Sequence, residues 1–398
     1  MDGVRRRVAA AGVNSPFREE ARRLEENGIT RAAVSRLGRR CKLPFFLGES
    51  DIATAGFIRD AVKQALDDGR TFYAHSQGLP ELRQAVGAYL HRLYGREIDT
   101  DRITVPGSAM LGVTLAAHTA LSRGDHGLIV CPAWPNIDAV FRVTGAKIGY
   151  VPQRMTRHGW QLDPRELFAS VRGDTRAIYV NSPCNPTGWV MSPREQRLLL
   201  DFCRERNILL ISDEVYHRTC FEGDPAPSFL EVAGERDPLV VVNGFSKAWA
   251  MTGWRLGWMV TPLGSGVSWS ALSESYNTGA TVFAQYGGIA ALERGEPFVR
   301  DLRERFRKAR AIVDAALIGH ELIDYRSPAG AFFAFPRIRG LENGPRFVQE
   351  LLAEEDVGLA PGHTFGPGFE SHVRLSFARP LDALAEGVKR LVRFVEKR

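Results

Sequence analysis

The feature that most constrains this chain is an alternation of short apolar runs with longer helix-like stretches, from about residue 51 to about residue 288. The runs at residues 177–180, 208–211 and 239–242 are rich in valine, isoleucine and leucine. Such runs are typical of strands buried on both faces. Because strands that alternate with helices favour a parallel sheet, the chain is predicted to have an α/β fold.

Polar groups follow each of these runs. Asn185 lies in a Pro- and Gly-rich loop after the first run, Asp213 follows the second, and Lys247 and Arg255 follow the third. The carboxyl ends of parallel strands are where α/β sheets place ligands. A lysine there can form a Schiff base and an arginine can clamp a phosphate, which suggests pyridoxal phosphate. Taken singly, Asn185 also fits a turn and Asp213 a helix cap, and Lys247 and Arg255 also fit two solvated surface cations.

A fourth segment begins with Gly107, Ser108 and Ala109 and opens an apolar stretch that continues to Leu121. This stretch is expected to be a buried helix whose first amides form an anion site. In their order and spacing, the four segments resemble the class I/II aminotransferases, which are fold-type I pyridoxal-phosphate enzymes of the aspartate-aminotransferase type. The resemblance implies a large domain with a mostly parallel seven-stranded sheet flanked by helices, plus a smaller α+β domain.

The resemblance also implies a role for each cofactor residue. Lys247 would carry the Schiff base and later act as a general acid and base, which requires a lowered pKa. Asp213 would pair with the pyridine nitrogen and keep it protonated. Asn185 and Tyr216 would bind the phenolic oxygen, and Trp134 would stack on the ring. Lys247, Asp213 and Tyr216 are the expected catalytic residues.

The phosphate and the substrate would be held by further residues. The phosphate ligands implied by the resemblance are Arg255, Ser246, the amides of Gly107, Ser108 and Ala109, and Tyr73 from a partner chain. Residues 73–83 are similar to the family's interface-crossing segment, so a homodimer with shared active sites is expected. Arg374 would bind the substrate's α-carboxylate as a bidentate pair, and Asn185 is also expected to contact the substrate. Gly48 would bring its backbone close to the same carboxylate because it has no side chain.

Three positions depart from the family pattern. Gly244 stands where many relatives have a serine that meets the phosphate, so Ser246 is expected to suffice. Ser50 stands where relatives often have proline. Residues 269–288, from which dicarboxylate-specific relatives supply an arginine, contain no lysine or arginine. A preference for aspartate or glutamate is therefore not expected.

We interpret the chain as a pyridoxal-phosphate-dependent aminotransferase that moves an amino group between an amino acid and a 2-oxo acid. The alternative is a lyase or synthase on the same scaffold, which would eliminate, replace or cyclise a side chain. An aminotransferase-like transcription regulator is a third reading. It would need a DNA-binding domain, for which the 47 residues before Gly48 are expected to leave too little room.

Composition agrees with an ordinary globular enzyme of 398 residues, with 44% hydrophobic and 25% charged content. The net charge of +6 comes from 52 basic and 46 acidic residues that are intermixed, which does not favour nucleic-acid binding. Five cysteines without redox or metal-ligand spacing fit a reducing cytoplasm. No signal-peptide core or apolar stretch of about 20 residues indicates export or membrane insertion. The histidine spacing predicts no metal site.

The domain boundaries are expected near residues 50 and 290. Residues 1–50 would contribute to the small domain, residues 51–290 would form the large cofactor-binding domain, and residues 291–398 would form the C-terminal small domain. Within these ranges, helices are expected at residues 15–26, 298–317 and 346–354, and a strand at residues 329–335.

Overall fold

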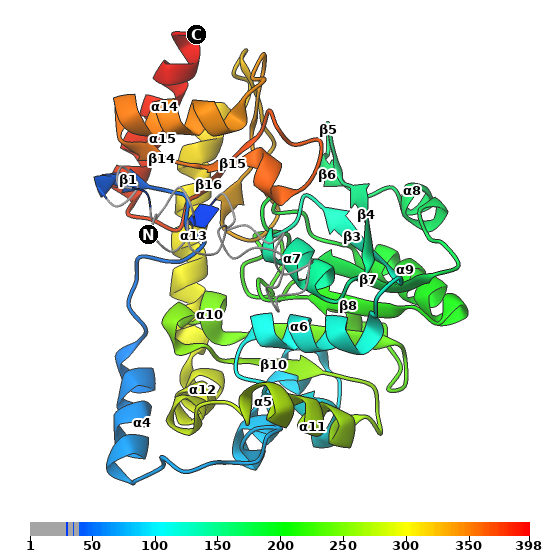
Figure 1. Ribbon diagram of the computed structural model, residues 1–398. Coiled ribbons are helices and arrows are strands. Elements are labelled where there is room, and N and C mark those ends of the chain that lie inside the picture. The colour runs from blue at the N-terminus through cyan, green and yellow to red at the C-terminus, as the bar shows by residue number, and fades with distance from the viewer. Residues whose placement is uncertain (1–28, 31–34, 36–39) are drawn as a thin grey trace, which may run out of the picture.

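The computed structural model describes residues 29, 30, 35 and 40–398, and its centre is a seven-stranded sheet (Figure 1). Its strands are β2 (Ile103–Thr104), β3 (His126–Cys131), β4 (Lys147–Pro152), β7 (Thr175–Asn181), β8 (Leu209–Asp213), β9 (Leu239–Gly244) and β10 (Gly257–Val260). Their order across the sheet is β2-β10-β9-β8-β7-β3-β4. β10 runs antiparallel to β2 and β9, and the remaining neighbours are parallel. The prediction of a mostly parallel seven-stranded sheet is confirmed.

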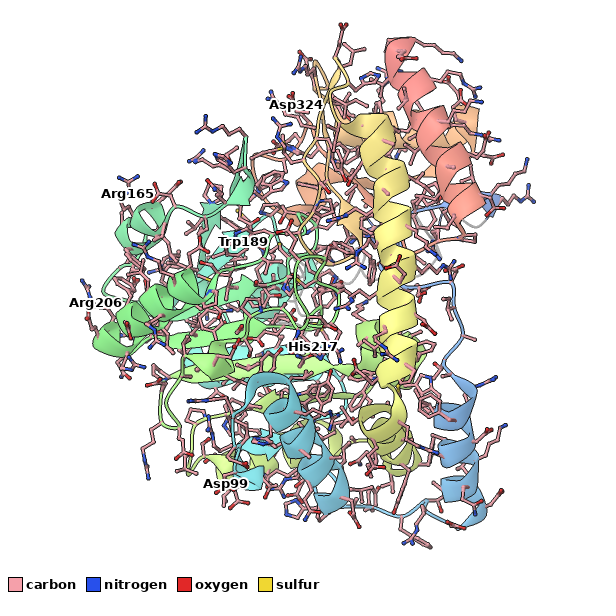
Figure 2. The ribbon with its side chains drawn as sticks, turned by 180° about the vertical axis from the view of Figure 1, so that it is seen from behind. Asp99, Arg165, Trp189, Arg206, His217 and Asp324 are labelled. Carbon is pink, nitrogen blue, oxygen red and sulfur yellow. The ribbon has the colours of Figure 1, made fainter. Side chains whose placement is uncertain are left out.

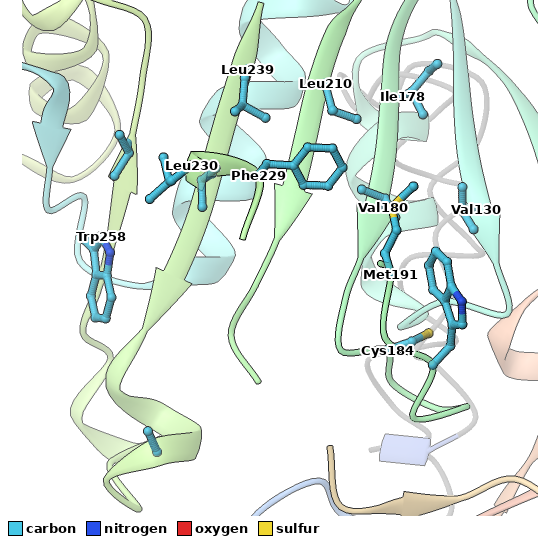
Figure 3. Close-up of a cluster of buried hydrophobic side chains, with 14 of the residues drawn as sticks. Val130, Ile178, Val180, Cys184, Met191, Leu210, Phe229, Leu230, Leu239 and Trp258 are labelled. Atoms are coloured by element: carbon cyan, nitrogen blue, oxygen red, sulfur yellow. The ribbon is translucent and has the colours of Figure 1, made fainter. Parts of the chain in front are cut away.

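Helices cover both faces of this sheet. The helices of this part are α4 (Gly56–Asp67), α5 (Pro80–Tyr94), α6 (Ala109–Ala120), α7 (Asn136–Val143), α8 (Pro164–Ala169), α9 (Pro193–Arg206), α10 (Phe245–Ala248), α11 (Gly266–Asn277) and α12 (Val282–Arg294). On one face, α6 and α7 enclose an apolar layer with the strands. On the other face, Ile178, Leu210 and Leu239 from three neighbouring strands belong to one apolar cluster with the buried Phe229 (Figure 3).

Successive residues of β7 and β8 therefore serve different layers. Ile178 and Val180 belong to the layer that contains Phe229, whereas Tyr179 belongs to the layer beneath α6. Because strand side chains alternate between faces, both sets can be apolar only if the sheet is covered on both sides. This accounts for the unbroken apolar runs in the sequence.

The C-terminal part has a separate apolar core. It is built from α13 (Glu296–Leu317), α14 (Gly344–Glu355), α15 (Leu381–Glu396), β1 (Leu43–Pro44), β11 (Ile323–Asp324), β12 (Phe333–Ala334), β13 (Arg337–Ile338), β14 (Val357–Gly358), β15 (Ala360–Pro361) and β16 (Val373–Ser376). β1 pairs with β14, so the segment just before Gly48 joins this part, as the ribbon shows (Figure 1). The expected domain boundaries stay a prediction.

Two expected helices are present as α13 and α14, each slightly longer than predicted. The expected strand at residues 329–335 is wrong in extent, because only β12 pairs in a ladder. Ala331 has a φ of 56°, which interrupts an extended conformation. The helix expected at residues 15–26 lies outside the described residues.

Several charged side chains lie at the outside of the molecule, although others, such as Arg374 and Asp213, are buried. Seen from behind, Arg165, Arg206 and Asp324 lie near the rim, whereas His217 lies further in (Figure 2). Among the described residues, no helix is long and apolar enough to cross a membrane. The same residues contain no group of histidine, cysteine and acidic side chains that is suited to a metal ion.

Candidate active site

The carboxyl ends of β7, β8 and β9 meet at one edge of the sheet, beside a cavity of about 310 Å³. Ten of the thirteen predicted site residues line it: Gly48, Ala109, Trp134, Asn185, Asp213, Tyr216, Ser246, Lys247, Arg255 and Arg374. The other three, Gly107, Ser108 and Tyr73, are not among its lining residues. The structure thus brings together groups that lie as far apart in the sequence as Gly48 and Arg374.

Lys247 lies on the short helix α10, directly after β9. Its Nζ donates a hydrogen bond to the carbonyl oxygen of Gly48 at 2.6 Å and lies 5.8 Å from the ring centroid of Tyr216. Burial, followed by the positive charge of Arg374, lowers the pKa of the Lys247 amine to about 8. About a tenth of this amine is therefore neutral and nucleophilic at pH 7, far more than for an exposed lysine.

Asp213 ends β8, where it pairs with Asn181 of β7. The hydroxyl of Tyr179 donates to its Oδ2 at 2.8 Å, and the amide of Val215 donates to its Oδ1 at 3.3 Å. Burial raises the pKa of Asp213 to about 6, and the bond from Tyr179 opposes that rise. The carboxylate of Asp213 can still accept a further hydrogen bond, because its two oxygens together offer about four lone-pair sites and these two donors occupy only part of them.

Arg374 reaches the cavity from β16 and is almost fully buried, at 2% exposure. Its Nη1 donates to Oδ1 of Asn185 at 3.1 Å, and its Nη2 donates to the carbonyl oxygen of Phe46. Its Nε has no hydrogen-bond partner among the described residues. Burial lowers the pKa of this guanidinium to about 10. A buried cation with a free donor fits an incoming carboxylate, because a partner would offset its desolvation.

One end of the cavity is formed by the start of α6, from which Ala109 and Met110 line it. The hydroxyl of Ser108 accepts a hydrogen bond from the amide of Leu111, so this side chain caps the helix. Gly107 has a φ of 115°, and a Cβ there would come within 2.8 Å of Asn277 Nδ2. Ala109 and Arg255 line the cavity nearby. First-turn amides and an arginine make this end suitable for an anion.

Gly244 stands where many relatives have a serine, and little space is left for a side chain at this position. A Cβ at this position would meet the Cβ of Ala109 and the carbonyl oxygen of Leu256, each at 3.3 Å. A larger residue there would need its neighbours to shift. Ser246 lines the cavity. It is therefore the serine that we expect to contact a bound anion.

Tyr73 lies outside this chain's own cavity, in the connection between α4 and α5. Its side chain is 89% exposed, and that of the preceding Phe72 is 82% exposed. Neighbouring aromatic side chains with this exposure are unusual on a free surface and are suited to a contact with another chain.

Several residues at the site were not predicted from the sequence. Tyr179 and Asn181 bind Asp213, and Thr252 lines the cavity while donating to Glu49 Oε2 at 3.2 Å. The alternation of β7 was the available signal, since it places Tyr179 and Asn181 on one face. The pairing register that brings Asp213 to that face was not readable from one sequence. The other unpredicted lining residues are Ile29, Thr30, Leu47, Met110, Val113, Asn136 and Val215.

Comparison with known proteins agrees with this geometry. Residues 45–391 match the family described as aminotransferase class I and II. The chain is 33% identical over 353 residues to an aspartate aminotransferase of Pyrococcus horikoshii, covering 88% of this chain and 90% of the relative. It is 34% identical over 364 residues to a probable aspartate/prephenate aminotransferase of Aquifex aeolicus, covering 89% and 91%.

Solved structures give the same result. An aromatic aminotransferase from Pyrococcus horikoshii superposes with a TM-score of 0.84 at 33% identity, covering 88% of this chain and 95% of that one. An alanine aminotransferase from Pyrococcus furiosus superposes with a TM-score of 0.88 at 26% identity, covering 96% and 100%. These matches favour amino-group transfer over the lyase or synthase alternative. The chain therefore belongs to the class I and II aminotransferases, and its fold is that of the fold-type I enzymes.

Proposed function

We propose that the chain binds pyridoxal phosphate in this cavity and uses Lys247 to transfer an amino group between a small amino acid and a 2-oxo acid. The observation that carries the proposal is the presence of Lys247, Asp213 and Arg374 around one cavity. When bound, the cofactor supplies an aldehyde that condenses with amines and a ring that accepts electrons from the substrate's α-carbon.

The lining residues fit such a cofactor. Asp213, with acceptor capacity to spare, suits a protonated pyridine nitrogen, and Asn185 and Tyr216 suit the phenolic oxygen. Trp134 suits the face of the ring. The phosphate would lie at the anion end, near Arg255, Ser246 and the amides of Gly107, Ser108 and Ala109.

Arg374 and Lys247 then have separate roles in the reaction. Arg374 binds the substrate's α-carboxylate through its guanidinium, whose Nη1 lies 3.9 Å from where a Cβ on Gly48 would stand. This contact orients the α-carbon toward Lys247, which lies beside Gly48. The neutral Lys247 amine removes the proton from the α-carbon and can return it to a neighbouring carbon. General acid–base transfer of this kind contributes about 10²–10⁴-fold to a rate.

We further propose a homodimer in which Tyr73 reaches the phosphate end of the partner's cavity. The exposure of Phe72 and Tyr73 supports this, since an interface would bury both rings. The five cysteines are all unpaired, which supports a reducing cytoplasmic location. We retain residues 51–290 as the cofactor-binding domain and residues 291–398, with the N-terminal 50, as the small domain.

We also propose that the amino donor has an uncharged side chain. Among the described residues that line the cavity, the cations are Lys247, Arg255 and Arg374, and each is assigned to the cofactor or to the α-carboxylate. The wall between them carries apolar side chains: Ile29, Leu47, Met110 and Val113. Burying a second carboxylate against such a wall costs several kcal/mol unless a cation pairs with it. The proposed donor thus differs from the one in the printed names of the aspartate aminotransferases above.

The test is a half-reaction on the purified holoenzyme. A suitable amino acid alone should convert the bound cofactor stoichiometrically to pyridoxamine phosphate, and a 2-oxo acid should then restore the starting spectrum. Leucine, methionine and phenylalanine should react faster than aspartate and glutamate. Sustained turnover with release of ammonia and no need for an oxo acid would replace this proposal with the lyase reading. Faster reaction of aspartate would overturn only the donor class.

A further inference from the structure

The strand pair β7 and β8 brings an unassigned tyrosine, Tyr179, into contact with Asp213, which lines the cavity. Asn181 pairs with Asp213, and Tyr179 pairs with Ile211. Because side chains alternate along a strand, Tyr179 and Asp213 project from the same face and are diagonal neighbours across the ladder. The register therefore directs the hydroxyl of Tyr179 toward the carboxylate of Asp213.

Tyr179 is buried along its whole length, with 0% exposure. Its ring lies in the apolar layer beneath α6, to which that helix contributes Val113, Leu115, Ala116 and Ala117. The hydroxyl donates to Asp213 Oδ2 at 2.8 Å. In a layer of this kind a hydroxyl without a partner would cost about 1–3 kcal/mol, so the phenol and the carboxylate constrain each other.

The neighbouring residue on the same face holds the backbone. Asn181 donates its Nδ2 to the carbonyl oxygen of Asp213 at 2.8 Å, and its Oδ1 accepts the amide of Asn185 at 2.7 Å. Asp213 is thus held by β7 at both its side chain and its backbone. Asn185, in turn, receives the hydrogen bond from Arg374.

We propose that Tyr179 is a positioning residue for the cofactor, whose buried hydroxyl holds Asp213 as an oriented carboxylate facing the pyridine nitrogen. The inference rests on the proposed function, since it assumes that Asp213 pairs with that nitrogen. It goes beyond it by giving a task to a residue that a core-packing account would treat as interchangeable with phenylalanine.

The hydrogen bond has an electrostatic consequence. A donor to the ionised form stabilises it, so Tyr179 lowers the pKa of Asp213, while burial raises it to about 6. The other titratable groups around Asp213 are Lys247 on α10, Tyr216 after β8 and Cys184 after β7. Loss of the Tyr179 hydroxyl therefore moves the pKa of Asp213 upward, and the carboxylate takes up a proton at a higher pH.

The test uses Tyr179→Phe, which keeps the ring and removes only the hydroxyl. The probe is 4′-deoxypyridoxine 5′-phosphate, which has the pyridine and phosphate but cannot react with Lys247. Its dissociation constant from the apoenzyme is measured between pH 5 and 9 by fluorescence or calorimetry. Tyr325→Phe is the matched control, because Tyr325 is equally buried and donates to Asp314 at the same 2.8 Å, far from the cavity.

We expect wild-type affinity to fall as the pH drops through about 6, because the protonated Asp213 no longer attracts the protonated pyridine. In Tyr179→Phe this fall should begin about one pH unit higher, so that affinity at pH 6 is about fivefold weaker while affinity at pH 8.5 changes little. Tyr325→Phe should lower the melting temperature without moving the pH profile.

A double-mutant cycle with Asp213→Asn distinguishes a specific effect on Asp213 from general damage to the fold. In that background, which has no carboxylate to ionise, adding Tyr179→Phe should leave the pH profile of probe binding unchanged. An unchanged profile for Tyr179→Phe in the otherwise native chain would overturn the positioning role. If the wild type does not bind the probe at all, the proposed function has failed instead, so the two outcomes are distinct.

Discussion

The amine of Lys247 lies 2.6 Å from the carbonyl oxygen of Gly48. This contact joins the end of the central sheet to the segment that follows β1, and β1 itself pairs with β14 in the C-terminal part. The reactive amine and the backbone proposed to approach the substrate therefore come from the two sides of the cavity. A substrate bound between them would replace one protein–protein contact with contacts of its own, so binding and the arrangement of the two sides are linked.

Covalent attachment of the cofactor is expected at Lys247. Borohydride reduction of the holoenzyme, followed by peptide mass spectrometry, should locate the reduced cofactor on this residue, because its Nζ is the lysine nitrogen at the cavity. Lys247→Ala should still bind pyridoxal phosphate without a covalent link, since the anion end and Asp213 remain. Attachment to any other lysine would contradict the assignment.

Capture of pyridoxal phosphate by the apoenzyme should depend on pH through Lys247. Its folded-state pKa is lowered to about 8, so the amine is protonated below this value and neutral above it. The capture rate, followed by stopped-flow absorbance, should rise with pH and level off above about 8. In Arg374→Ala the midpoint should move to higher pH, because one charge that disfavours protonation is gone. A midpoint near 10 in the wild type would disprove the lowered pKa.

Arg374→Ala should chiefly weaken substrate binding. The change removes a charged contact to the α-carboxylate, so it should cost about 2–4 kcal/mol of transition-state stabilisation. The specificity constant kcat/KM should then fall roughly 30- to 1000-fold. Steady-state kinetics with one donor would separate the effect on KM from that on kcat. Arg337→Ala is the control, because this arginine lies on β13, in a different sheet from Arg374, and its side chain is 55% exposed. Equal effects of the two changes would argue against the assigned role.

Sharing of the active site can be tested by complementation. Tyr73→Ala and Lys247→Ala should each be poorly active, and mixing them should restore part of the activity, since one of the two sites in a hybrid dimer regains both intact groups. Size-exclusion chromatography should give a dimer, and exchange of subunits should be verified with tagged chains. A fully active monomer, or no rescue despite exchange, would remove Tyr73 from the site.

The sequence by itself determined the sheet class and about half of the residues that line the cavity, because those signals are local. The apolar run at residues 239–242 has to be a buried strand, and Lys247 follows it at a fixed chain distance. The same reasoning held for Asp213 after β8 and for the start of α6. Local patterns failed where a nearby residue took an unusual conformation, as at Ala331, whose positive φ shortened an expected strand.

Only the tertiary structure decided which of these local features meet. The bond from Tyr179 to Asp213 depends on the register of β7 against β8, the bond from Arg374 to Asn185 spans 189 positions in the chain, and Ile29 reaches the cavity wall from the opposite end of the chain from Arg374. The lowered pKa of Lys247 and the raised pKa of Asp213 follow from burial, which packing creates and a motif does not encode. The physical reason is that register, burial and long-range contacts are properties of the assembled core, whereas residue type and spacing are properties of the chain.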